Sequence, residues 1–414
     1  MERALRLLSL TEYGELPGIA LSAAERDGLL GLAPALMLRP ALGLDGTFDL
    51  IADSYVGAVE LGSLAIEVRP KVPLDRVMFL MSYAIDPRQW KELQFSFGEQ
   101  DSVVEAIARG FAGQLQRAIG RGLLQGYITT EDSMLTVRGR IRIDDQIRRW
   151  YGRMPPVEVR FDEFTEDIVE NRLLKAALRR LGQLRLRSPT TRSLLRHFDP
   201  AFAGVTDIAV DPRCVPPVSY TRLNQHYRPA VELARLILRD SSWDLRHGAA
   251  RASSFFLDMS RVFEEFVHVA LREALAESEG DLRRGDRSFR LDDSGAVVLK
   301  PDLTWWVAGR CRFVGDVKYK RIAVSGIINA DLYQLLAYTL ATGLPRGTLI
   351  YAHGFDGRVR HQIPTAGKVL EVDPIRLDGE PEQILAEITR IASGVLDHGL
   401  DRSTALSRGI AGVA

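Results

Sequence analysis

The sequence is poor in several residue types, and each shortage excludes a class of protein. It has two cysteines, Cys214 and Cys311, which are too few and too far apart for a disulfide framework or a cysteine-rich zinc site. Low cysteine use is typical of a reducing compartment, so we expect a cytoplasmic protein. No apolar run approaches the roughly 20 residues that span a bilayer. The N-terminal segment also lacks the apolar core of a secretory signal.

Net charge is the second shortage. The 54 lysines and arginines balance the 54 aspartates and glutamates, whereas proteins that bind nucleic acid on their own usually carry a basic surplus. A nucleic-acid role would need local basic patches or capture by a partner. Arginines cluster at 138–149 and 179–187, where they either contact phosphates or form an ordinary solvated face, which we favour for the first cluster. The chain has no Walker A motif and so does not bind GTP by that route.

Lysine is the third shortage. The chain has seven lysines: Lys71, Lys91, Lys175, Lys300, Lys318, Lys320 and Lys368. Three of the seven fall between residues 300 and 320, while arginine carries nearly all the positive charge elsewhere. Arginine cannot act as a proton-transfer group, whereas a buried lysine can shift its pKa. The concentration of lysine in one segment therefore indicates a chemical role for it.

That segment predicts a β-hairpin, with one strand over 297–307, a turn at 308–310 and a second strand over 311–319. If the turn centres on Gly309, Asp302 lies opposite Asp316, with Cβ atoms about 4.5–5.5 Å apart. Lys318 is two residues from Asp316, so it lies on the same face of the strand. Two carboxylates and one ammonium are the groups that magnesium-dependent hydrolysis of a phosphodiester needs.

Two predicted helices flank the hairpin. The first runs from about residue 258 to 277 with an apolar stripe at spacings of three and four, and Glu264 lies beside that stripe. Glu264 would reach the acidic pair as a third metal ligand, with Glu265 as the alternative, or both would belong to a solvated face. In the second helix, Gln334 and Tyr338 are four residues apart and share a face. This pair either contacts DNA or the attacking water, or covers an edge of the core.

The chain organisation predicts a multidomain α+β or α/β protein of three parts. Residues 1–160 are predicted to form a β-rich N-terminal domain, 161–248 a helical connecting region and 249–414 a domain with a mixed sheet flanked by helices. The elements expected in the first part are strands at 47–52, 56–61 and 64–71, helices at 77–84 and 101–125, and further strand over 134–161. A basic helix is expected from 166 to about 187 and a closing helix over 381–396.

These residues together resemble a known nuclease family. The motifs of the likeness are Glu264 on a helix, Pro301-Asp302, Asp316-Val317-Lys318 and Gln334 with Tyr338, which look like the PD-(D/E)xK fold. A narrower likeness, to McrC proteins, includes Tyr220-Thr-Arg-Leu-Asn-Gln-His-Tyr-Arg-Pro-Ala and Phe256-Leu-Asp-Met-Ser-Arg-Val-Phe-Glu-Glu-Phe-Val. Segments 137–141 and 163–175 are also similar. The resemblance covers about residues 50 to 355.

The resemblance to McrC, the nuclease subunit of McrBC modification-dependent restriction systems, implies a magnesium-dependent endonuclease, with Mn²⁺ as a possible substitute. It implies cleavage of DNA containing 5-methylcytosine together with an AAA+ GTPase of McrB type, whose GTP hydrolysis the chain would stimulate and into whose ring its N-terminal part would dock. Asp302 and Asp316 would hold the metal, with Glu264 as a third ligand and the Val317 carbonyl as a further one. Lys318 would serve the attacking water.

Two other functions remain open from the sequence. The chain could act mainly as a scaffold that activates a GTPase, or as a stand-alone PD-(D/E)xK nuclease. A double-strand break needs two active sites, so dimerisation is expected for cleavage.

Overall fold

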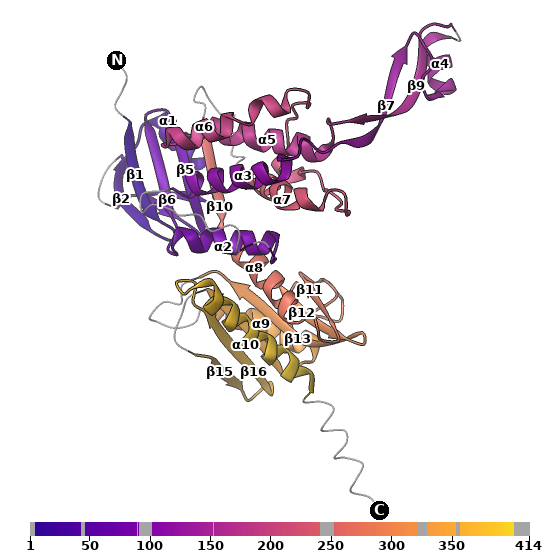
Figure 1. The fold of residues 1–414 in the computed structure, drawn as a ribbon. Helices are drawn as coiled ribbons and strands as arrows, with labels where there is room; N and C mark the ends of the chain where they lie inside the picture. The colour runs from indigo at the N-terminus through magenta and orange to yellow at the C-terminus, as the bar shows by residue number, and fades with distance from the viewer. Residues whose placement is uncertain are drawn as a thin grey trace, which may run out of the picture. The chain divides into compact units, whose positions relative to one another are not determined.

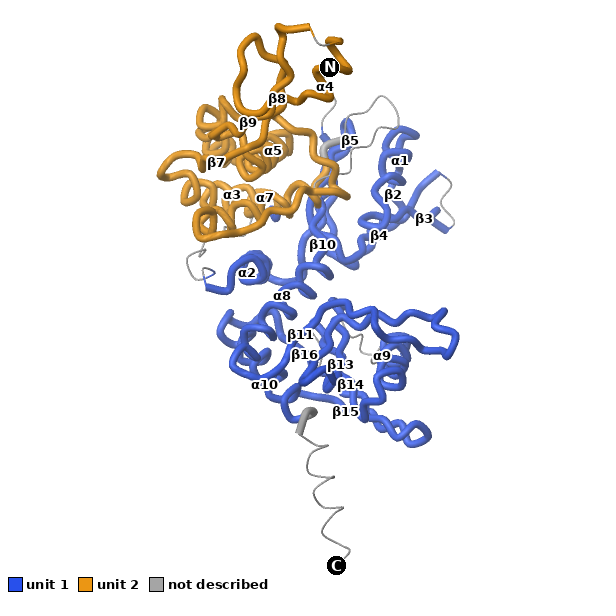
Figure 2. The backbone as a smooth tube through the Cα atoms, turned by 90° about the vertical axis from the view of Figure 1, so that its right-hand side faces the viewer, with its two compact units in different colours: residues 1–103, 245–252, 256–414 blue, residues 104–244, 253–255 orange. Residues whose placement is uncertain are grey.

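The computed structural model describes residues 5–42, 46–88, 90, 102–151, 153–240, 252–320, 329–352 and 357–400. The chain forms two compact units (Figure 2): unit 1 is 1–103, 245–252 and 256–414, and unit 2 is 104–244 and 253–255. The mixture of sheets and helices is the predicted α+β architecture. Residues 104–160, expected in the N-terminal domain, belong to unit 2. The expected boundary after residue 248 and the end of the chain lie outside the described residues.

Strands predominate in the N-terminal part of unit 1. One sheet has the order β1-β6-β5-β10, with β1 parallel to β6, and a second has the order β2-β4-β3. The elements are β1 (Arg6–Thr11), β2 (Glu15–Ala20), α1 (Ala23–Leu30), β3 (Leu36–Pro40), β4 (Thr47–Ala52), β5 (Tyr55–Leu61), β6 (Leu64–Arg69), α2 (Leu74–Ile85) and β10 (Ala252–Asp258). Strands β4 to β6 and helix α2 confirm the elements predicted between residues 47 and 84.

Unit 2 has a helical body and an arm that extends from it, built on β7 and β9 (Figure 1). Its elements are α3 (Val103–Ile119), β7 (Gly126–Met134), β8 (Arg140–Ile141), α4 (Ile143–Trp150), β9 (Val157–Thr165), α5 (Val169–Gln183), α6 (Pro189–Arg196), three 3₁₀ turns (Asp199–Phe202, Pro212–Cys214, Gln225–Tyr227) and α7 (Arg228–Asp240). Helices α3 and α5 were predicted from their apolar periodicity, and both are present.

Helix α4 corrects the prediction of strand over 134–161. Its first turn holds Asp144 and Asp145, and its last turn holds Arg148 and Arg149. Acids at the start and bases at the end of a helix complement its dipole, and this charge order outweighs the local preference for strand. The two strands β7 and β9 pair antiparallel on either side of the helix, so the segment is a strand, a helix and a strand.

The C-terminal part of unit 1 is a six-stranded mixed sheet of order β11-β12-β13-β14-β16-β15. Strands β13, β14 and β16 run parallel, and the remaining pairs are antiparallel. The elements are α8 (Met259–Ala274), β11 (Asp281–Arg284), β12 (Leu303–Val307), β13 (Arg310–Lys318), α9 (Asn329–Thr342), β14 (Arg346–Ala352), β15 (Val359–Ile363), β16 (Lys368–Ile375) and α10 (Pro381–Leu400). Helices α8 and α10 confirm the helices predicted there. In the described residues, no helix combines the length and apolar character that crossing a bilayer requires.

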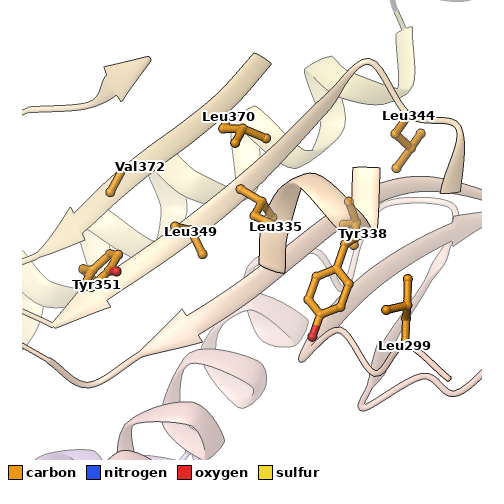
Figure 3. Packing of buried hydrophobic residues seen from close by; sticks show 9 residues of the cluster. Leu299, Leu335, Tyr338, Leu344, Leu349, Tyr351, Leu370 and Val372 are labelled. Carbon is orange, nitrogen blue, oxygen red and sulfur yellow. The ribbon is translucent and has the colours of Figure 1, made fainter. Parts of the chain in front are cut away.

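The two faces of this sheet are covered by different helices. Helix α9 covers one face, where Leu335 and Tyr338 lie against sheet residues such as Leu349 in a buried cluster (Figure 3). Val314 of β13 belongs to the same cluster. On the other face, the ring of Tyr319, just after β13, lies 5.9 Å from that of Phe263 in α8. Because side chains alternate along a regular strand, from Phe313 onward the even-numbered residues of β13 face α9 and the odd-numbered ones face α8.

Glycine at position 347 of β14 allows α9 to approach the sheet closely. A Cβ atom there would lie 2.6 Å from Thr339 Cγ2 and 2.9 Å from Leu335 Cδ1. Gly347→Ala should therefore overpack this interface and lower the free energy of unfolding by about 1–3 kcal/mol. Thermal unfolding followed by circular dichroism measures the change. Gly204→Ala, where a Cβ meets nothing within 4 Å, should leave the melting temperature unchanged; an equal effect of both substitutions would contradict the packing argument.

Candidate active site

The predicted hairpin is formed by β12 and β13, and it has the predicted register. Leu303 pairs with Gly315, so Asp302, one residue before β12, lies beside Asp316. The turn has two residues, Ala308 and Gly309, both with positive φ (47° and 72°), which is typical of a tight hairpin turn. The predicted turn had three residues. A bulge between Trp305 and Trp306 compensates for the difference and restores the register on which the acidic pair depends.

The first strand is shorter than predicted. It begins at Leu303 rather than Val297, and Val298 makes only an isolated bridge, to Arg290. Pro301 explains the late start, because proline has no N–H to donate to a ladder of strand hydrogen bonds. Asp302 therefore lies immediately before the first residue of the strand rather than within it.

The two carboxylates and the lysine are brought together in a largely buried setting. Asp316 is 1 % exposed. The backbone N–H of Val317 donates to Asp302 Oδ2 at 2.9 Å. Lys318 Nζ lies 2.6 Å from Asp316 Oδ2 as an ion pair, although the angles are not those of a hydrogen bond, and this buried oxygen accepts no hydrogen bond from the described residues. The Lys318 ammonium thus compensates the charge of the Asp316 carboxylate.

Burial and mutual repulsion set the protonation of the site. Burial, together with the neighbouring charge of Asp316, raises the pKa of Asp302 to about 7. Burial alone would lower the pKa of Lys318, but the attraction of Asp316 outweighs it and raises that pKa. Without a metal, Lys318 is therefore an ammonium at neutral pH and not a free base, and Asp302 is about half protonated.

The oxygen atoms of the site fit a hard divalent cation. Two carboxylates at the end of a hairpin, one with a buried oxygen that lacks a hydrogen-bond donor, match the ligand preference of magnesium. A third oxygen is available from the backbone: the N–H and C=O of a residue in an extended strand point to the same edge. Because the Val317 N–H reaches Asp302, the Val317 carbonyl points to that edge as well.

Glu264 and Glu265 do not join the pair. Arg284 Nε binds Glu264 Oε1 at 3.0 Å, and Arg284 Nη1 lies 3.7 Å from Glu265 Oε1. The reason is topological: α8 covers the face of the sheet opposite to Asp316 and Lys318. Within the described ranges, no three His, Cys, Asp or Glu side chains are close enough to hold one metal ion.

Gln334 and Tyr338 interact as their spacing predicts, and they support the site from behind. Gln334 Nε2 donates to Tyr338 Oη at 2.7 Å, and the Tyr338 hydroxyl donates to the Lys300 carbonyl at 3.1 Å. Tyr338 is buried in the cluster under α9 and thereby holds the segment that leads to Asp302, whereas Gln334 is exposed beside it. Of the two predicted roles, covering an edge of the core applies to Tyr338. Gln334 remains available for contacts outside the chain.

Sequence reasoning missed a second polar group near the site. Asp331 of α9 is 4 % exposed; it accepts from Lys320 Nζ at 3.1 Å and from the Tyr351 hydroxyl at 2.5 Å. Lys320 is two residues beyond Lys318, so strand alternation was an available signal for its side. The acid that binds it lies across a separate helix and could not be identified by spacing.

The arginine cluster at 138–149 is mostly engaged within the arm. Arg142 Nη2 lies 2.9 Å from Glu131, Arg149 donates to buried Glu158, and the Arg138 guanidinium lies over a phenylalanine ring. These contacts favour the structural alternative over phosphate binding for this cluster.

Three comparisons relate the chain to known proteins. The family described as "McrBC 5-methylcytosine restriction system component" matches residues 50–352. A curated relative from Escherichia coli (strain K12), the type IV methyl-directed restriction enzyme EcoKMcrBC, is 21 % identical over 318 residues, which cover 72 % of this chain and 91 % of the relative.

Among solved structures, the half-complex of Thermococcus gammatolerans McrB AAA+ hexamers with bound McrC contains a similar chain. The TM-score is 0.58 with 20 % identity, covering 94 % of this chain and 100 % of the other. At this identity the likeness concerns the fold. It extends over both units of the chain.

The pKa of Asp302 leads to a testable pH dependence. Because the metal must displace a proton from this pair, Mg²⁺ or Mn²⁺ affinity should rise up to about 10-fold per pH unit below pH 7 and level off above it. The free energy of unfolding of the metal-free protein should change in the opposite direction. The stabilisation by protonated Asp302 is present below pH ~4 and is lost as the pH rises through about 7.

Isothermal titration with Mn²⁺ between pH 5.5 and 8.5 measures this dependence. Asp302→Asn should weaken binding and abolish its pH dependence, while Asp49→Asn, a buried acid of the N-terminal sheet, should leave both unchanged. Affinity that is independent of pH in the unmodified chain would refute the shared-proton description.

Proposed function

The chain belongs to the family of McrBC 5-methylcytosine restriction system components, and from this premise we propose that it is the nuclease subunit of such a system. Together with an AAA+ GTPase partner, it would cleave DNA that contains 5-methylcytosine. The observation that carries the proposal is the buried group of Asp302, Asp316 and Lys318 at the end of a hairpin. This arrangement supports the assignment of the C-terminal sheet as a PD-(D/E)xK nuclease core.

In this proposal, Asp302, Asp316 and the Val317 carbonyl hold one magnesium ion. Magnesium bound there would neutralise charge on the phosphate and lower the pKa of a water molecule. Lys318, kept charged by Asp316, stabilises the negative charge that develops on the phosphate oxygens. Tyr338 fixes the approach to Asp302 through the Lys300 carbonyl, and exposed Gln334, which donates to Tyr338, would contact DNA or water.

A third acidic ligand is absent from the proposed set. Since Glu264 pairs with Arg284, the remaining coordination positions of magnesium would be taken by water and phosphate oxygens, as is usual for this ion. The role first expected of Glu264 would require the side chain to leave Arg284 and cross to the other face of the sheet.

The partner in this proposal is an AAA+ GTPase of McrB type; the Thermococcus gammatolerans structure contains McrB AAA+ hexamers with bound McrC. The arm of unit 2 supports it, because helix α4 exposes Ile143 (65 %) and Ile147 (58 %) four residues apart, on one side of the helix. Tyr127 and Phe164 are also exposed and contact each other with ring centroids 4.9 Å apart. Exposed apolar groups on an extension favour binding to another protein.

A second candidate function is a scaffold whose main task is to stimulate GTP hydrolysis. The exposed apolar side of the arm favours it, since this feature would serve the GTPase whether or not the chain cuts DNA. A stand-alone nuclease is less favoured, because a chain without net charge has little general attraction for DNA.

Plasmid cleavage with Mg²⁺, GTP and the cognate GTPase tests the proposed site. Asp316→Asn and Lys318→Ala should each lower the cleavage rate by about 100-fold or more, because each removes a charge at the reacting phosphate. Both variants should still stimulate GTP hydrolysis. Cleavage that continues at the unmodified rate in either variant would disprove the site, and cleavage of unmethylated DNA without a partner would favour the stand-alone nuclease.

Stimulation of GTP hydrolysis tests the arm. Replacing Ile143 and Ile147 by serine should raise the concentration needed for half-maximal stimulation by about 10-fold or more, because the apolar contact is lost. The substitutions are on an exposed side, so the melting temperature should not fall. Leu223→Ser, an exposed apolar residue outside the arm, is the matched control. Equal stimulation by all three proteins would exclude this side of α4 as the docking site.

A further inference from the structure

Two residues that follow the first strand of the N-terminal sheet form hydrogen bonds with Tyr319, the residue that follows Lys318. Glu12 and Tyr13 lie at the end of β1, and Tyr319 lies just beyond β13, 307 positions from Glu12. The Tyr319 hydroxyl donates to Glu12 Oε1 at 2.8 Å, and the Tyr13 hydroxyl donates to the Tyr319 carbonyl oxygen. The two bonds run in opposite directions. They hold both the side chain and the backbone of residue 319.

Both residues that hold Tyr319 are in energetically unfavourable states. Glu12 is 0 % exposed, and its Oε2 has no hydrogen-bond partner among the described residues. Tyr13 has φ 57°, a left-handed conformation that is unfavourable for a bulky residue. A glycine or asparagine would close this turn with less strain. The turn alone therefore does not explain why a glutamate and a tyrosine occupy it.

Glu12 and Tyr13 are also bound to residues next to the N-terminal sheet. The Glu12 N–H donates to the Arg69 carbonyl at 2.9 Å, and the Lys71 N–H donates to Glu12 Oε1 at 2.8 Å. The Lys71 ammonium lies 4.2 Å from the centre of the Tyr13 ring. One carboxylate oxygen therefore accepts from both Lys71, which follows β6, and Tyr319, which follows β13.

The end of β13 needs such support. Strand β12 pairs with β13 only as far as Gly315, and beyond that point the described contact on this edge is the hydrogen bond from Val317 to Asp302. On the other edge, Lys318 is the last residue paired with β14. Lys318 is thus at a strand end, where chains tend to fray. The next contacts along the chain are those of Tyr319 with Glu12 and Tyr13.

We propose that Glu12 and Tyr13 are positioning residues that hold Lys318 in place for DNA cleavage by fixing Tyr319. They touch neither the metal site nor the reacting phosphate and act through the strand end. The inference rests on the proposed nuclease function. It extends the working site to a segment more than 300 residues away in the sequence.

Steady-state cleavage of methylated plasmid by the full chain with its GTPase tests this role. Tyr319→Phe removes one hydroxyl without changing the packing against Phe263, and it should lower kcat by about 10- to 100-fold with little change in KM, since misplacement of a catalytic group affects the chemical step. Glu12→Ala should have a similar effect. Glu12→Gln, which still offers an oxygen to Tyr319 and Lys71, should retain clearly more activity than Glu12→Ala.

Tyr220→Phe is the matched control. It removes an equivalent hydrogen bond, from the Tyr220 hydroxyl to Glu232 at 2.7 Å, in unit 2, and it should leave kcat unchanged. Wild-type kcat in Tyr319→Phe and Glu12→Ala would overturn the positioning role. An equal loss in Tyr220→Phe would also overturn it, because any lost tyrosine bond would then be sufficient.

A second readout does not depend on cleavage. With seven lysines in the chain, selective ¹³C labelling of lysine gives few NMR signals, and Lys318→Arg identifies that of Lys318. Tyr319→Phe should shift the Lys318 signal and leave that of Lys175, in unit 2, in place. If the unmodified chain does not cut DNA, the proposed function fails, and the spectrum then decides only whether the Tyr319 contact holds Lys318 in place. An unmoved Lys318 signal would reject it.

Discussion

Two carboxylates enclosed in one site repel each other, and the surroundings of the site are organised by the ways in which that repulsion is offset. The Lys318 ammonium compensates Asp316, the Val317 N–H supports Asp302, and burial together with the charge of Asp316 raises the pKa of Asp302 to about 7, so that this carboxyl is partly protonated near neutral pH. Each of these interactions has a different structural cause. Strand alternation places Lys318 beside Asp316, hairpin register places Asp302 beside Val317, and burial raises the pKa of Asp302. A divalent cation would replace the proton and complete the balance of charge.

The strand ends that carry the site are held from opposite faces of one sheet. Tyr338 of α9 binds the backbone that leads to Asp302, and Tyr319, on the face covered by α8, joins the strand after Lys318 to the N-terminal sheet. Tyrosine suits both places, because its ring fills apolar space while its hydroxyl satisfies a buried polar partner. The reactive groups are thus placed at chain ends, yet each end is held by a hydrogen bond from a buried ring.

How far the sequence predicts this structure depends on the range of each interaction. The hairpin register and the apolar stripe of α8 follow from local periodicity, and both are confirmed. The pairing of Glu264 with Arg284 could not be predicted in this way, since no local pattern tells which face of the sheet a helix covers. Helix α4 was missed because its short apolar pattern also suits a strand. The partnership of Glu12 with Tyr319 spans 307 positions, and no spacing rule could reveal it.

The bulge between Trp305 and Trp306 has a consequence for how this hairpin can vary. The bulge adds one residue to β13 opposite β12, and the two-residue turn removes one, so Asp302 and Asp316 remain level. A turn of altered length without a matching change in the bulge would slip the strands, and a slip of one residue sends every side chain to the opposite face. An insertion or deletion in the turn between β12 and β13 is therefore tolerated only together with a compensating change in the bulge, so the turn and the bulge must vary together.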